Sequence, residues 1–276
     1  MGKYPNRKGG HSMLYSDSRR VHYEKPQLAE VICQLRFPAI LSIGAKEPAE
    51  FQDAIRSMFP RYTAKQEQLP PKMIAPGTPG AKLEAPAPVT NYYFISADNR
   101  WKLNLTRNFI SLSTVAYPGW EEFTRQFDLP LAEFIRIYNP AFFERIGLRY
   151  LNVFSRSALD LQDEPWRALI SPAYLGPLSQ EDVKEESALK CSIDTELSLD
   201  NSCRARIHAG PGQVRHNLPG APQSNEVKFI FDMDLAMSGQ IDPRMAAAGL
   251  ETLHAHSTPL FQGAITDRLH SALQPR

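Results

Sequence analysis

The chain has 276 residues, of which 42% are hydrophobic and 22% are charged. These values are ordinary for globular domains and exclude a chain that is disordered throughout. Its 31 basic and 30 acidic side chains leave a formal net charge of +1. The chain as a whole therefore has no field that would draw it to nucleic acid or anionic lipid.

The N-terminal residues 1–27 are polar and basic, and they lack the apolar core that a signal peptide needs. We expect them to form a flexible tail. No run of about 18 apolar residues occurs elsewhere, so we expect a soluble, cytoplasmic protein with no membrane partner. Cys33, Cys191 and Cys203 are few and widely spaced, which argues against a disulfide framework and a CxxC motif. Cys191 and Cys203 would pair only if they faced each other across a hairpin.

We expect an N-terminal lobe over residues 28–156. Val31, Cys33 and Leu35 alternate with polar neighbours, which predicts a half-buried strand over 29–37. Phe51 and Ile55 are four residues apart, which is typical of a short amphipathic helix. Residues 63–90 are rich in proline and glycine without a sustained period, so they predict a long surface loop, either a lid or a plain insertion.

Three runs, NYYFISA, RWKLNLT and FISLSTVAY, are joined by short junctions that contain asparagine. Because Asn tolerates positive φ, these runs predict an antiparallel meander. A helix should follow, kinked at Pro130 and ended by Pro140. Its apolar stripe consists of Phe123, Phe127, Leu131, Phe134 and Tyr138. The next stretch, ERIGLRYLNVFS, has the alternation of a strand covered on both faces.

Residues 157–186 predict a connector, and residues 187–276 a C-terminal lobe. There ALKCSIDTELSL and SCRARIHAG predict a hairpin, EVKFIFDMDLAM a third strand, and the stretch from Asp242 to Leu269 one long helix bent at Pro259. Both halves thus end with three antiparallel strands that lead into a long helix. We expect an α+β protein of two lobes, each an antiparallel sheet packed by a long helix, with structural duplication as a hypothesis.

The central strand carries the first candidates for a ligand site. Alternation places Tyr150 and Asn152 on one face and Arg149 on the other, so they cannot form one compact triad. In a structural role, Tyr150 and Asn152 bond to neighbouring loops and Arg149 neutralises a carboxylate. In a functional role, Arg149 and Asn152 hold an anionic or amide ligand, because a guanidinium fits either task.

Charged residues on the later strands are the other candidates. Asp232 and Asp234 share one face about 7 Å apart and could seat a divalent cation, but no third ligand stands at a telling spacing. Pairing with arginines on the next strand is the alternative. Arg204, Arg206 and the nearby Arg215 form either such cross-strand partners or a basic patch for phosphate or nucleic acid, which the neutral net charge disfavours.

The sequence contains no recognisable catalytic motif. His254 and His256 are two residues apart, which is not the spacing of a zinc-binding helix. The GPG at residues 210–212 lacks the pattern of a phosphate loop, and no GxSxG nucleophile elbow occurs. We therefore assign no catalytic residue, no metal site and no cofactor.

Several stretches together suggest a family: QLAEVICQLRFP, YPGWEEF, RIGLRYLNVF, FIFDMDL and LETLHAHSTPLFQGAIT. The chain resembles a sporadically distributed bacterial family of uncharacterised proteins of about this length, whose most specific feature is a GLRYxN-type core, here Gly147 to Asn152. The resemblance implies no activity. Its patchy distribution implies a gene that moves between genomes, as phage-defence and toxin-antitoxin genes do. The pattern of three strands and a long helix also resembles SecB-like chaperones in shape.

Three functional hypotheses follow. The leading one is a non-catalytic intracellular binding protein that recognises a protein partner or a small ligand, as an accessory of a phage-defence or toxin-antitoxin module. The second is an enzyme or nucleotide-responsive sensor with a pocket between the lobes, walled by Arg149, Tyr150 and Asn152 with both aspartates nearby. The third is nucleic-acid binding through Arg204, Arg206 and Arg215.

Overall fold

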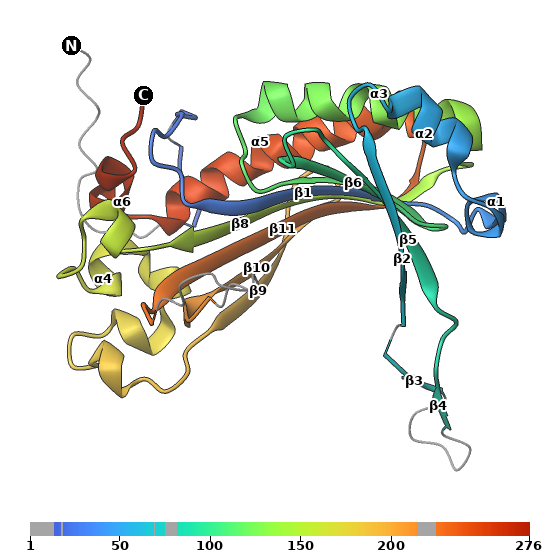
Figure 1. The fold of residues 1–276 in the computed structure, drawn as a ribbon. Coiled ribbons are helices and arrows are strands. Elements are labelled where there is room, and N and C mark those ends of the chain that lie inside the picture. Colours follow the sequence, from blue (N-terminus) through green and yellow to red (C-terminus); the bar gives the residue numbers. More distant parts are fainter. Residues whose placement is uncertain (1–13, 18, 69, 75–81, 215–224) are drawn as a thin grey trace.

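The computed structural model describes residues 14–17, 19–68, 70–74, 82–214 and 225–276. Its described part contains one antiparallel sheet of nine strands in the order β2-β5-β6-β7-β1-β8-β11-β10-β9 (Figure 1). The strands are β1 (Leu28–Arg36), β2 (Arg61–Glu67), β5 (Val89–Ile95), β6 (Trp101–Leu105), β7 (Phe109–Thr114), β8 (Phe143–Phe154), β9 (Ile193–Ser198), β10 (Cys203–Gly212) and β11 (Lys228–Ile241).

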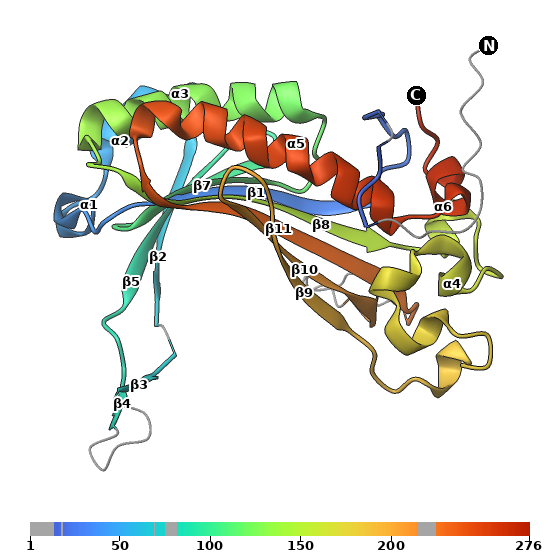
Figure 2. The same cartoon turned by 180° about the vertical axis from the view of Figure 1, so that it is seen from behind.

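The helices of the described residues are α1 (Leu41–Ala45), α2 (Ala49–Ile55), α3 (Trp120–Tyr138), α4 (Trp166–Leu169), α5 (Ala246–Ala264) and α6 (Asp267–Ala272). Short 3₁₀ turns are formed by Ser157–Leu159, Pro172–Tyr174, Gly176–Ser179, Glu185–Ser187 and Pro243–Met245. The two long helices, α3 and α5, cover the same face of the sheet (Figures 1 and 2).

The sheet joins the two halves of the chain through β8. This strand pairs with β1 on one side and β11 on the other, so that Arg149 lies opposite Ile32 and Asp234. The α+β class and the antiparallel pairing are confirmed. The two lobes are not confirmed, because the strands of both halves continue one sheet, and the structural duplication stays a prediction. The physical reason is that β8 has apolar residues on both faces and pairs with a neighbouring strand along both edges.

The helix layer matches the sequence at α3 and differs from it at α5. The stripe predicted for the first long helix is buried in α3 except for Tyr138, which is only partly buried. The helix ends where Asn139 takes a left-handed conformation before Pro140. The sequence predicts that the second long helix continues to Leu269, and this prediction is wrong. Ile265 is extended and bridges to Ile170, and α6 begins with a new cap at Thr266.

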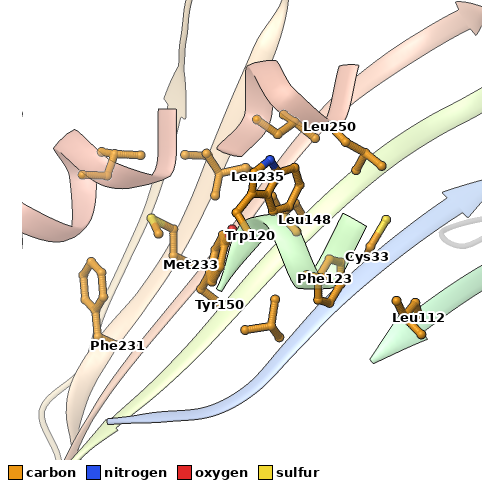
Figure 3. Close-up of a cluster of buried hydrophobic side chains, with 14 of the residues drawn as sticks. Cys33, Leu112, Trp120, Phe123, Leu148, Tyr150, Phe231, Met233, Leu235 and Leu250 are labelled. Atoms are coloured by element: carbon orange, nitrogen blue, oxygen red, sulfur yellow. The ribbon is translucent and has the colours of Figure 1, made fainter. Parts of the chain in front are cut away.

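The main core lies between this helix layer and the sheet. Trp120 and Phe123 of α3 face the apolar side chains of β8 and β11 (Figure 3). Aromatic rings form part of this packing. The centroid of the Phe123 ring lies 5.8 Å from that of Trp101 on β6 and 6.0 Å from that of Trp120. Other buried members of the cluster are Cys33, Leu112, Leu148, Tyr150, Phe231, Met233, Leu235 and Leu250.

Strands also occur where the sequence predicts only a loop. The described part of residues 63–90 contains most of β2 and the two-stranded sheet of β3 (Lys72–Ile74) and β4 (Lys82–Glu84). These strands form an arm that projects from the body of the molecule (Figure 1). They were missed because β2 is exposed on almost its whole length, so it has no apolar alternation to detect.

The N-terminal segment, meaning the described residues 14–17 and 19–27, is packed where the sequence predicts a flexible tail. It crosses the second half of α5 and meets the C-terminal residues (Figure 2). Gly263 permits this crossing, because a Cβ there would stand 2.2 Å from the carbonyl oxygen of Leu14. The backbone bonds that hold the segment are Ser16 N to Pro259 O (3.0 Å), Lys25 N to Leu273 O (3.1 Å), Glu24 N to Gln274 O (3.0 Å) and Arg276 N to His22 O (2.8 Å).

Candidate functional site

A cavity of about 140 Å³ lies where the N-terminal segment, the sheet and α5 meet. Alternation along β8 directs Tyr150 and Asn152 to this side of the sheet, under the helix. On α5, the spacing of His254, Ser257 and Phe261 turns them toward the same space. The other lining residues are Arg20, Val21, His22, Tyr23, Pro26, Gln27, Leu28, Tyr117, Gly119, Met233, Thr258, Gln262 and Leu273.

A buried tyrosine and histidine form the floor of the cavity. The Tyr150 hydroxyl lies 2.6 Å from Nδ1 of His254, and the His254 ring stacks on Trp120 at a centroid distance of 4.1 Å. Burial, aided by the positive charge of Arg20, lowers the pKa of His254 to about 3. Burial also raises the pKa of Tyr150 well above its ordinary value, with a further contribution from Tyr117. Both rings are therefore neutral at physiological pH.

Some buried polar atoms beside the cavity have no hydrogen-bond partner among the described residues. Among them are Nε2 of His254 and Oε1 of Gln262, on residues that are only 7% and 4% exposed. A buried polar atom left unpaired costs about 1–3 kcal/mol. Gln262 is otherwise held by its Nε2, which donates to the carbonyl oxygen of Arg19.

Asn152 and Tyr117 complete the inner wall. The Asn152 amide donates to the carbonyl oxygen of Phe231 at 3.3 Å, which holds its side chain against β11. The Tyr117 ring meets the Tyr150 ring edge to face at 6.0 Å. Burial raises the pKa of Tyr117 to about 12. The wall is thus aromatic and uncharged.

Arg149 lies on the opposite face of the sheet, as the alternation of β8 predicts. Its guanidinium makes two hydrogen bonds to the Asp232 carboxylate, at 2.7 and 2.5 Å. This is the structural role that the sequence left open for Arg149. Arg145 binds Asp234 in a similar way, at 2.7 and 2.8 Å. The five candidates Arg149, Tyr150, Asn152, Asp232 and Asp234 are therefore divided between two faces and do not form one pocket.

Gly147 explains how Arg145 reaches its partner. A Cβ on Gly147 would stand 2.0 Å from an Nη atom of Arg145, so the arginine side chain lies across the strand at the glycine. The absence of a side chain at this position is what leaves room for the guanidinium beside Asp234. The glycine of the GLRY stretch thus has a packing role on the open face.

The basic residues of β10 are paired with acidic residues, as one of the two sequence readings expects. Arg204 and Arg206 both approach Glu196, at 3.5 and 3.7 Å, and His208 lies 2.7 Å from Asp194. Arg215 lies outside the described residues. A shallow hollow of about 210 Å³ on this face is lined by Arg149, Asp194, Arg206, Ile207, His208, Asp232 and Asp234. The charges in the hollow largely cancel.

The fold and the site together define an α+β protein with a cavity of about 140 Å³ under its N-terminal segment, whose floor is formed by buried residues. No protein-family model and no curated protein matches the chain. The family resemblance therefore stays a prediction. None of the described helices combines the length and the apolar character that a membrane crossing requires. All three cysteines carry free thiols.

Sequence reasoning missed half of the cavity. His254 lacks the spacing of a zinc ligand, yet it stands four residues after Leu250 and three before Ser257 on the buried stripe of α5. A histidine at such a position is a signal for a buried polar contact. Arg20 gave no signal, because the N-terminal segment has no periodicity that predicts packing on a helix. Gln262 gave none either, because it is a polar residue of α5 and the apolar spacing of that helix singles out other positions.

Proposed function

We propose that this chain is a non-catalytic binding protein that holds a small molecule in the cavity between the N-terminal segment, β8, β11 and α5. The observation that supports the proposal is the cavity itself, about 140 Å³ with aromatic walls and unpaired polar atoms beside it. An apolar cavity of about 150 Å³ is large enough to hold benzene. Ligand sites combine apolar walls with a few convergent polar groups in this way.

The chemistry of the cavity favours binding over catalysis. A general acid or base works best with a pKa near the operating pH. His254 is far below that range and Tyr150 far above it, and the two are bonded to each other. The alternative, an enzyme or nucleotide-responsive sensor, needs Arg149 and Asn152 on one wall, but they lie on opposite faces of the sheet.

A ligand screen with matched variants tests the proposal. A panel of small metabolites would be scanned for a rise in Tm, expected to reach about 5 °C at one hundred times Kd. Ser257→Leu fills the cavity from α5 and should abolish the rise. Thr252→Leu is the control, because Thr252 also bonds its hydroxyl to a helix carbonyl but does not line the cavity. A rise that survives Ser257→Leu, or a panel in which nothing stabilises the wild type, would contradict the proposal.

The biological setting is a separate proposal that rests on the family resemblance. In it the protein works in the cytoplasm as an accessory of a phage-defence or toxin-antitoxin module, where a protein partner recognises it. Co-purification from the host, together with the identity of neighbouring genes, tests this setting. The duplication is also kept as a proposal: β5–β7 lead into α3 and β9–β11 lead into α5, and both helices cover the same face.

A further inference from the structure

The charge of the cavity lining has one sign. Among the described residues that line it there is one arginine, Arg20, and there are two histidines, but no aspartate or glutamate. Arg20 and His22 line the cavity and are exposed, so they mark where the cavity meets solvent, which we call its mouth. Glu24 forms an ion pair with Arg276 and does not line the cavity. The cavity therefore presents a cation at its entrance, and no carboxylate that lines it offsets this charge.

Two carboxylates do stand near the inner wall, yet outside the cavity. The charges of Glu121 and Glu251 both raise the pKa of Tyr117, whereas the charge of Arg20 lowers it. Glu251 accepts a hydrogen bond from Nε1 of Trp120 at 2.7 Å, which partly satisfies its charge. The charge of Arg20 lowers the pKa of all three inner rings, Tyr117, Tyr150 and His254. Arg20 forms no ion pair with another described residue. Arg20 is thus the charged group that a molecule in the cavity would meet.

The walls of the cavity are rings set at steep angles to one another. The Tyr23 ring meets the Phe261 ring edge to face at a centroid distance of 5.8 Å, and the Tyr117 ring meets the Tyr150 ring in the same way at 6.0 Å. Aromatic rings pack well against other planar rings, by stacking or by edge-to-face contact. A planar guest would gain such contacts on several sides, whereas a bulky aliphatic guest would not.

From these observations we propose that the cavity binds a planar aromatic molecule with a single carboxylate, its ring among the tyrosines and its carboxylate at Arg20. The inference rests on the proposed function and gives that site a chemical class of ligand. The volume suits one ring with small substituents, on the order of ten non-hydrogen atoms. A carboxylate at the mouth keeps part of its hydration, so it avoids the large cost of a fully buried charge.

The test compares probes that differ in one property. Calorimetry would measure binding of benzoate and 4-hydroxybenzoate, with benzamide as the neutral planar match, cyclohexanecarboxylate as the non-planar acid and phenyl phosphate as a different anion. We expect both aromatic acids to bind at least about tenfold more tightly than benzamide, which lacks the charge for a charge-assisted hydrogen bond to Arg20, and cyclohexanecarboxylate, which lacks the ring. Phenyl phosphate should not bind more tightly than benzoate, because its phosphate carries up to two negative charges and the lining offers a single arginine.

Two neighbouring arginines supply matched variants. Arg20→Gln should reduce benzoate affinity about tenfold and leave benzamide unchanged. Arg19→Gln is the control, since the Arg19 side chain is also exposed but does not line the cavity. If benzamide matches benzoate, or phenyl phosphate exceeds it, the ligand class is overturned while a binding function stands. If no aromatic acid binds but another compound binds in a Ser257-dependent way, the class is again wrong. If nothing binds at all, the class and the proposed function both fail.

Discussion

The low pKa of His254 predicts a stability loss at mildly acidic pH. The ring is buried at the floor of the cavity, and its pKa is lowered from 6.5 to about 3. Below the ordinary value the unfolded chain takes up a proton at His254 that the folded protein does not, so the free energy of unfolding falls as pH falls. Between pH 7.5 and 5 the free energy of unfolding falls by about 2 kcal/mol through this residue. The loss depends little on the pKa of His254 in the folded protein as long as that pKa stays below about 4.

Urea denaturation of the wild type and His254→Gln over this pH range measures the effect. Glutamine does not titrate, so the variant should lose about 2 kcal/mol less than the wild type between pH 7.5 and 5, although it is less stable at pH 7.5 because the stack on Trp120 is lost. All other titrating groups are common to both proteins and cancel in the difference. His256→Gln removes an imidazole from the same helix and is the matched control. Equal pH slopes for wild type and His254→Gln would refute the reasoning.

Three further predictions concern glycine and cysteine positions. Gly263→Ala raises helix propensity by up to about 1 kcal/mol, but the added Cβ clashes with the backbone of the N-terminal segment. Trypsin should therefore cleave that segment faster in the variant. An unchanged cleavage rate would count against the crossing. Gly147→Ala should cost about 1 kcal/mol by displacing Arg145 from its aspartate, and a double-mutant cycle with Arg145→Ala should show strong non-additivity; simple addition would contradict the packing role. Burial raises the pKa of the Cys33 thiol, so a thiol reagent should modify the partly exposed Cys191 first, and early labelling of Cys33 would be unexpected.

The sequence predicted those elements whose periodicity reflects burial on one face. The meander of β5 to β7 and the helix α3 follow from such patterns, and so does the separation of Arg149 from Tyr150 and Asn152. The pairing of β10 arginines with acidic neighbours also follows, because alternation puts opposite charges on one face of adjacent strands. These features depend on local order along the chain.

Features that depend on distant segments were not predicted. The exposed arm of β2 to β4 has no apolar pattern, and the N-terminal segment is held by backbone bonds that its side chains do not encode. The break at Ile265 arises from pairing with Ile170, almost one hundred residues earlier. The cavity combines both problems: β8 and α5 could be anticipated, but the N-terminal segment that closes it could not.

Because the sheet is continuous, cutting the chain between β8 and β11 would expose the edges of both strands. A fragment that ends after β8 would expose a long apolar strand edge, because eleven residues of β11 are registered against it. The complementary fragment would expose the matching edge of β11. Unpaired apolar edges of this kind recruit other strands, so we expect each half expressed alone to aggregate, and the two halves co-expressed to recover by pairing with each other. Split-protein complementation would then report on the assembly of a single sheet.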